Sequence, residues 1–161
     1  MITDKLNKSY KTDGLANEDY YAFGQSIISP CDGEIIQVVD GIKDNKPGDM
    51  NAMYVPGNTV ILKTAKNEFL FFAHLKQQTI KVKQGDRVRR GKVLGLCGNT
   101  GNSSEPHLHF HIMNTEDINV ATGVKCYFEN ILVNGNKKTD YSPVKGDKIQ
   151  NVVVKVKKKD L

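Results

Sequence analysis

The chain has 161 residues, 39% of them apolar, and its 23 Lys and Arg against 18 Asp and Glu give a formal charge of +5. This length suits one domain with a single core, and no stretch approaches the roughly 18 apolar residues that a membrane span requires. The mild basic excess alternates with apolar residues, as on a solvated strand face, and no aromatic-rich motif accompanies it, so we expect no nucleic-acid partner.

The first residues, MITDKLNKSY, lack the apolar core of a signal peptide, so we expect no export signal in the chain. Residues 1–25 and 40–58 show no strand pattern. The second of these segments is too long for a hairpin turn, and we expect a surface loop there. Such a loop is either close to a functional site or a plain insertion, and the sequence leaves both open.

Short runs rich in β-branched residues, separated by glycine turns, follow one another along the chain. They have the residue pattern of strands, and no window of about 12 residues shows a capped helical stripe. The predicted strands lie within residues 26–40, 58–64, 69–75, 78–88, 92–98, 107–113, 125–133 and 151–156. We therefore expect an all-β fold of antiparallel strands, a sandwich or a barrel, with the strands after residue 113 closing the sheet.

The three cysteines are Cys31, Cys97 and Cys126. Their odd number and wide spacing argue against a disulfide framework or a thiolate zinc site, and each is expected to be a small, buried or half-buried apolar residue. Cys97 lies ten residues before His107. A cysteine nucleophile paired with a histidine therefore stays open.

Three of the four histidines lie at alternate positions in SSEPHLHFHIM, residues 103–113. On a strand, His107, His109 and His111 share one face, about 6.5 to 7 Å apart, so we expect them to flank a small site and not to bind one ion together. His74 ends an apolar strand, and a neighbouring strand could set it across from His107. The cluster would then suit metal binding or proton transfer, the alternative being half-exposed or carbonyl-bonded strand histidines.

The segments FFAHL and VKQGDRVRRGKVLGLCGNTGNSSEPHLHFHI resemble the lysostaphin- and LytM-type zinc endopeptidases, which cut peptide cross-links in bacterial peptidoglycan. The resemblance begins at FGQSIISPCDGEI and covers about residues 20–113. It implies one peptidase-like β domain over residues 1–161, of the barrel-sandwich or duplicated hybrid motif type, with further strands and a basic tail over 114–161. It also implies a cell-envelope location and a peptidoglycan peptide or a protein as substrate.

The resemblance further implies roles for individual residues. His109 matches the zinc-binding histidine, while His107 and His74 match the catalytic residues that orient or deprotonate the zinc water and stabilise the oxyanion. His111 lies outside the family's required set and is expected to be a bystander. The family takes its other two ligands from an upstream histidine and aspartate; Asp4 is the best candidate for the aspartate, and no histidine precedes His74.

With Asp4 and His109 alone, zinc would be weakly held, because a catalytic site expects three protein ligands. Asp13 and Asp19 are weaker candidates for the aspartate. The hypothesis is a shortened or degenerate zinc metalloendopeptidase that keeps the fold and the catalytic histidines. The alternatives are a non-catalytic member that binds the cell wall or a partner protein, a histidine phosphocarrier of the sugar-transport IIA type, and a biotinyl or lipoyl carrier domain. The oligomeric state stays open.

Overall fold

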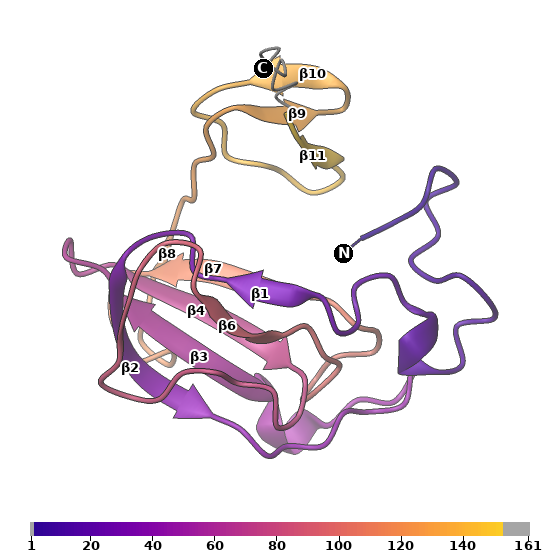
Figure 1. The fold of residues 1–161 in the computed structure, drawn as a ribbon, viewed down its shortest axis with the longest axis horizontal. Helices are drawn as coiled ribbons and strands as arrows, with labels where there is room; N and C mark the ends of the chain where they lie inside the picture. Colours follow the sequence, from indigo (N-terminus) through magenta and orange to yellow (C-terminus); the bar gives the residue numbers. More distant parts are fainter. Residues whose placement is uncertain (1, 153–161) are drawn as a thin grey trace, which may run out of the picture. The chain divides into compact units, whose positions relative to one another are not determined.

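The computed structural model describes residues 2–152, and the chain divides into two compact units, Met1–Gly123 and Val124–Leu161. Seven strand pairs in the described part are antiparallel (Figure 1), and the nearly all-strand structure confirms the predicted all-β class. Helical structure in residues 2–152 is limited to two 3₁₀ turns, η1 (Asn17–Asp19) and η2 (Ala52–Tyr54). No helix in residues 2–152 is long and apolar enough to cross a membrane.

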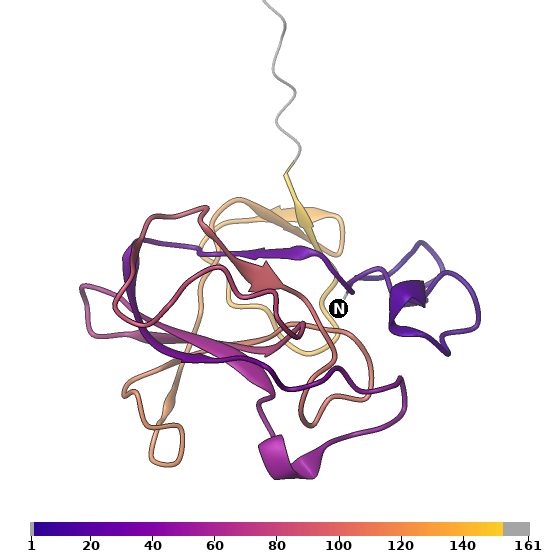
Figure 2. The ribbon, with the colours of Figure 1, turned by 60° about the horizontal axis from the view of Figure 1, so that its bottom comes forward.

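The first unit contains a small sheet and a large one, whose last strand runs one residue further, to Val124. The large sheet has six strands in the order β5-β2-β3-β4-β7-β8, which are β5 (Arg87–Val88), β2 (Gly33–Val39), β3 (Asn58–Lys63), β4 (Phe69–Leu75), β7 (His109–Met113) and β8 (Gly123–Val124). The small sheet pairs β1 (Ser26–Ile28) with β6 (Val93–Leu96). Figure 2 shows the small sheet as a second layer on one face of the large one.

The central strands β3 and β4 are covered on both faces. All seven residues of β4, FLFFAHL, are buried, as a continuous apolar run predicts for a strand with two covered faces. On one face Leu62 and Phe72 pack with Leu94 of β6 in the main core. On the other face Phe71 packs with Met113 of β7 in a smaller cluster. These two clusters fix the positions of the strand ends that carry the histidines.

The run 78–88 was expected to be strand with a glycine turn at QGDR, residues 84–87. The turn is present, but the strand prediction is wrong for most of the run. Only Arg87–Val88 pairs as a strand. Gly85 has a φ of 89°, and the backbone N–H of Lys83 donates to the Asp86 carboxylate at 3.0 Å. The apolar alternation is that of a strand, but this local turn ends the pairing.

The second unit has a sheet of its own, with strands β9 (Ile131–Val133), β10 (Asn136–Lys138) and β11 (Ile149–Asn151) in the order β10-β9-β11. The expectation that strands after residue 113 close the main sheet is therefore wrong for β9, because both of its edges pair within the second unit. The turn between β9 and β10 uses Asn134 and Gly135 at φ 51° and 82°, as an Asn-Gly hairpin requires. Of the predicted strand 151–156 and the basic tail, residues 153–161 lie outside the described part.

Residues 2–25 and 40–57 contain no strand, as predicted, yet specific hydrogen bonds anchor both. The Asp44 carboxylate accepts from the backbone N–H groups of Asn99 at 2.7 Å and Gln77 at 3.0 Å. Asn45 donates its side-chain amide to the Gly101 carbonyl at 2.7 Å. Asn17 in turn donates to the Asn45 carbonyl at 2.7 Å. The long loop is thus attached to the segment that precedes the clustered histidines.

Candidate active site

Four histidines come together where β4 ends and β7 begins. Ala73 lies opposite His109 in the β4–β7 register, which brings the next residue, His74, to the start of β7. The ring of His74 lies 4.8 Å from that of His107 and 5.8 Å from that of His109, measured between centroids. The predicted meeting of His74 and His107 is confirmed.

The prediction that the strand includes His107 is wrong, although the ring of His107 does join the other histidines, and Leu108 and Phe110 pack against the main core on the other face. Strand β7 starts at His109, so His107 belongs to the preceding loop, directly after the buried Pro106. The loop turns the ring of His107 back onto its own backbone, where Nδ1 lies 2.8 Å from the Glu105 carbonyl. This local contact, which strand periodicity cannot reveal, sets the direction of the imidazole.

His74 occupies a β-bulge. The register between β3 and β4 shifts between Asn58 and Val60, so that Ala73 and His74 together face the single residue Thr59. His74 has a φ of 61°, a left-handed conformation that is uncommon for residues other than glycine. Bulges of this kind re-aim a side chain, and backbone strain of this kind is often found at functional sites.

The bonds of His74 and His107 fix the tautomers of both rings. Nδ1 of His74 lies 2.8 Å from the Thr100 carbonyl, and Nδ1 of His107 lies 2.8 Å from the Glu105 carbonyl. A carbonyl oxygen only accepts, so each Nδ1 must carry the hydrogen and each Nε2 keeps a lone pair. The two imidazoles therefore offer two bare nitrogens in one cluster.

The Thr100 carbonyl is held in place by a close contact between two loops. The Thr100 hydroxyl donates to the Leu75 carbonyl at 3.0 Å and accepts from the Asn58 backbone N–H at 2.9 Å. A Cβ atom on Gly57 would lie 2.3 Å from Thr100 Oγ1, and one on Gly101 would lie 2.3 Å from the Gly57 nitrogen. Only glycine allows this approach, which gives the GNTG motif a structural reason.

His109 and His111 are joined directly, with Nε2 of His109 at 2.9 Å from Nδ1 of His111. Both rings contact the buried Phe71, His109 by its edge and His111 by a tilted stack at 4.9 Å. His111 was expected to be a bystander, but its ring contacts that of His109 and so belongs to the cluster. This proximity could have been predicted from the sequence, because residues two apart on a strand share a face.

Desolvation favours the neutral form of three of the four rings. Desolvation lowers the pKa of His74 from 6.5 to about 4; the hydrogen bond to Thr100 opposes this shift, and the neighbouring His107 and His109 add to it. The pKa of His109 is lowered by burial first and then by His111 and His107. Burial also lowers the pKa of His111. Near neutral pH these three imidazoles keep the lone pairs that a base or a metal ligand needs.

Asp4 is not brought into contact with any of these rings in the described structure. Its carboxylate accepts from the backbone N–H groups of Leu6 at 2.8 Å and Lys8 at 2.9 Å, closing a local turn. Imidazole nitrogens are ligands that suit zinc. Within residues 2–152, however, no group of three or more His, Cys, Asp or Glu side chains is arranged to hold a metal ion. The donor type fits zinc, a full ligand set is not assembled, and Asp4 as a ligand stays a prediction.

A groove leads away from the histidines along the outer face of the large sheet. A cavity of about 240 Å³ is lined by His74, His109 and Phe71, together with Val55 and Ile118 from two flanking loops. A larger cavity of about 520 Å³ shares Phe71 and Ile118 and continues over Ile61. The floor is apolar and the walls are loops, a shape that suits an extended peptide.

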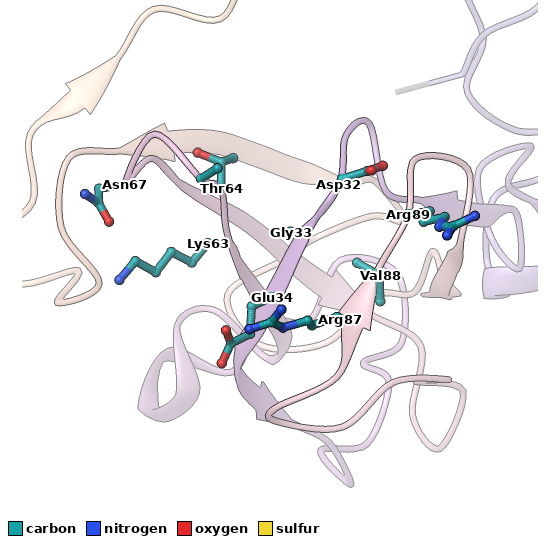
Figure 3. Close-up of a pocket in the computed structure, with 10 residues that line it drawn as sticks. Asp32, Gly33, Glu34, Lys63, Thr64, Asn67, Arg87, Val88 and Arg89 are labelled. Atoms are coloured by element: carbon teal, nitrogen blue, oxygen red, sulfur yellow. The ribbon is translucent and has the colours of Figure 1, made fainter.

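A third cavity, of about 700 Å³, includes none of the histidines. Its charged lining residues come from β2, the end of β3 and the β5 region (Figure 3), and are Asp32, Glu34, Lys63, Arg87 and Arg89. The lining mixes both signs of charge. It is distinct from the groove beside the histidine cluster.

The cysteines are free, with Cys97 buried and Cys31 and Cys126 half-buried. Burial raises the pKa of the Cys97 thiol to about 11, so it is a poor nucleophile near neutral pH. The cysteine-nucleophile alternative loses its support.

Comparison with known proteins gives a family match and several partial relatives. The family model described as Peptidase family M23 matches residues 18–120, which includes the predicted range. The peptidoglycan DD-endopeptidase ShyA of Vibrio cholerae is 39% identical over 57 residues, 35% of this chain and 13% of that protein. The cell division protein DipM of Caulobacter vibrioides is 33% identical over 89 residues, 55% of this chain and 12% of that protein. The chain thus matches only a small share of these relatives' own length.

Among solved structures, the catalytic domain of lysostaphin from Staphylococcus simulans is similar to this chain with a TM-score of 0.49. The alignment has 24% sequence identity and covers 71% of this chain and 81% of that one.

Proposed function

Because this chain belongs to peptidase family M23, we propose that its first unit hydrolyses peptide bonds in the cross-links of bacterial peptidoglycan. Membership of this family argues against the alternatives of a biotinyl or lipoyl carrier domain and of a histidine phosphocarrier. One structural observation carries the proposal: His74 and His107 each hold Nδ1 against a carbonyl and keep Nε2 bare beside His109. The similarity to the peptidoglycan DD-endopeptidase ShyA supports the substrate class.

We propose zinc as the cofactor, with His109 and Asp4 among its ligands; such an ion polarises the scissile carbonyl and acidifies water. His107 then acts as the general base, because its bare Nε2 can take a proton from the attacking water. Its Nδ1–H stays bonded to Glu105 throughout. Once protonated, Nε2–H can pass the same proton to the leaving amine.

His74 has a different role, because burial lowers its pKa to about 4 and disfavours a charged ring. We assign its bare Nε2 the task of accepting a hydrogen bond from the attacking water and orienting it. The apolar groove over Phe71 would hold the substrate as an extended peptide. Because peptidoglycan lies outside the cytoplasmic membrane, we propose that the reaction takes place there.

The test is digestion of purified peptidoglycan by the 161-residue chain with added zinc, followed by mass spectrometry of the released fragments. We expect new peptide ends, and a loss of roughly 100-fold or more in rate for His107→Ala and for His74→Gln. Lys66→Ala is the matched control, because Lys66 is exposed in the turn between β3 and β4, with its backbone N–H bonded only locally, to Thr64. Zinc content of the same samples is measured in parallel.

Two results would overturn the proposal. Equal cleavage by the wild type and both histidine variants would show that neither histidine takes part in the reaction. Retention of peptidoglycan by the chain with no cleavage at any zinc concentration would favour the non-catalytic, cell-wall-binding alternative.

A further inference from the structure

A buried serine lies against the ring of His107. Nδ1 of His107 is 2.8 Å from the Glu105 carbonyl and 3.2 Å from Oγ of Ser103. The same Ser103 hydroxyl donates to the Glu105 carbonyl at 2.9 Å. Ser103 is only 1% exposed. The imidazole nitrogen, the hydroxyl and the carbonyl therefore form a closed triangle of hydrogen-bonding groups.

The chemistry of the three groups decides where the hydrogens of this triangle lie. The carbonyl oxygen only accepts, and its two lone pairs can take one hydrogen from the Ser103 hydroxyl and one from Nδ1 of His107. The hydroxyl still offers a lone pair to the Nδ1 hydrogen, which it shares with the carbonyl. If Ser103 instead donated to a bare Nδ1, that nitrogen and the Glu105 carbonyl would face each other at 2.8 Å with no hydrogen between them.

The backbone of Ser103 is held without the help of its hydroxyl. Its N–H donates to the Gly101 carbonyl at 2.9 Å, and its carbonyl accepts from the side-chain amide of Asn45 at 3.1 Å. Because these bonds do not involve Oγ, removal of the hydroxyl should leave the course of the loop unchanged. The hydroxyl serves the triangle.

We propose that Ser103 is a positioning residue: its hydroxyl supplies a second acceptor for the Nδ1 hydrogen of His107 and so keeps Nε2 free to take a proton. The other tautomer of a neutral imidazole carries its hydrogen on Nε2 and cannot act as a base there. Two acceptors beside Nδ1 disfavour that tautomer. The effect of Ser103 on cleavage rests on the proposed function, whereas its effect on the ring is a property of the chain alone.

The first experiment is nitrogen NMR of the metal-free chain with labelled histidines, at about pH 8, where imidazoles are neutral. We expect the hydrogen of His107 on Nδ1. In Ser103→Ala the Nδ1 hydrogen should shift its resonance and exchange with water roughly threefold faster or more, because one of its two acceptors is gone. Ser103→Thr keeps a hydroxyl and should restore the wild-type behaviour.

Ser104→Ala is the matched control, because Ser104 is the exposed neighbour of Ser103 in the same loop. It should leave the signal of His107 unchanged. Two results would overturn the proposal: a wild-type His107 that carries its hydrogen on Nε2, or a Ser103→Ala chain in which the resonance and the exchange of the Nδ1 hydrogen are those of the wild type.

The second experiment is the kinetics of peptidoglycan cleavage. Ser103→Ala should lower kcat by roughly 3- to 10-fold, the range that one neutral hydrogen bond supplies. KM should stay near its wild-type value, since Ser103 does not line the described groove. The midpoint of thermal unfolding checks that the variant is folded. Wild-type kinetics in Ser103→Ala, or a raised KM with an unchanged kcat, would contradict the role in cleavage.

The failure of this proposal and that of the proposed function can be told apart. If the wild-type chain cleaves no peptidoglycan but Ser103→Ala alters the Nδ1 hydrogen of His107 as expected, the hydrolysis is wrong and the positioning of the ring holds. If the wild-type chain cleaves and Ser103→Ala changes neither the NMR signal nor kcat, the hydrolysis holds and the role of Ser103 is overturned.

Discussion

The rings of His74 and His107 are held in the same way, by backbone carbonyls of the segment between β6 and β7. Each ring gives its Nδ1 hydrogen to a backbone carbonyl, that of Thr100 for one and that of Glu105 for the other. Their burial differs, since His74 is only 5% exposed while His107 is half-buried. Two histidines with the same tautomer therefore lie in different surroundings, which allows them different roles.

The lowered pKa of His74 makes the stability of the zinc-free chain depend on pH. The folded pKa is about 4 against 6.5 in the ordinary state, so the stabilisation is complete above pH 6.5 and is lost as pH falls towards 4, where the unfolded chain binds a proton that the folded chain does not. We expect a loss of about 3 kcal/mol from this group across that window.

Urea unfolding of the zinc-free wild type and of His74→Gln, at pH 7.5 and in steps down to about 4, measures this effect. The variant should show a shallower loss, because the contribution of His74 is gone while those of His109 and His111 remain. Identical pH profiles would contradict the assignment to His74.

Part of the site could be predicted from single residues and part could not. Alternation and the position of His74 at a strand end were enough to bring His74 and His107 together. The contact between His111 and His109 was missed, because it depends on side-chain directions that the sequence does not give. The carbonyls of Thr100 and Glu105 were also missed, since every residue has a carbonyl and only the backbone path tells which one faces a ring.

Among the elements, two loops determine the site more than the strands do. The loop that ends at Gly57 and the loop that contains Thr100 and Gly101 touch backbone to backbone. Strand periodicity predicted β3, β4 and β6 because burial sets a regular pattern. It overextended the strand before the predicted glycine turn at Gly85, over residues 78–84, and it gave no information on loops held by side-chain amides.

Gly57→Ala should disturb the site through this loop contact. The new Cβ would lie 2.3 Å from Thr100 Oγ1, so the Thr100 carbonyl must move away from His74. We expect a loss of about 1–3 kcal/mol in the free energy of unfolding and a fall in peptidoglycan cleavage. Thermal unfolding and the cleavage assay measure the two effects.

Gly24→Ala is the matched control for that change. Gly24 also has a positive φ, 74° against 63° for Gly57, but a Cβ there meets nothing within 4 Å. Both variants carry the same backbone strain, and only Gly57→Ala carries the clash. Equal cleavage by the two variants would argue against the loop contact.

The segment after β7 forms one wall of the groove. Ile118 lines both cavities beside the histidines and is 45% exposed. Ile118→Trp should narrow the groove, raise KM roughly tenfold and leave kcat near its wild-type value, because the binding of substrate and transition state is weakened equally. Val120→Trp, at a 71% exposed position outside the groove lining, should change neither constant. If Ile118→Trp lowered kcat and left KM unchanged, the proposal that Ile118 lines the substrate groove would be contradicted.

At the scale of the whole molecule, the family match and the first compact unit nearly coincide. The match ends at residue 120 and the unit at Gly123. Both apolar clusters and all four histidines lie within this unit. The all-β class was predictable because turn residues and strand patterns recur along the chain, whereas the separate sheet of β9, β10 and β11 was not, since edge pairing depends on which strands meet in space.

A chain that ends at Lys125 should therefore keep its fold and its cleavage activity, since β8 and the clusters remain intact. Circular dichroism, the midpoint of thermal unfolding and the digestion assay compare it with the full chain. Loss of the histidine-dependent cleavage in a folded truncated chain would show that the second unit contributes to the site.

The most direct test of the proposed hydrolysis is peptidoglycan digestion in water enriched in heavy oxygen. Mass spectrometry should find one heavy oxygen in the new carboxylate of each released peptide, with the wild-type chain and with Lys66→Ala but not with His107→Ala. Release of unlabelled ends, or of labelled ends at the same rate with His107→Ala, would contradict water attack assisted by this histidine.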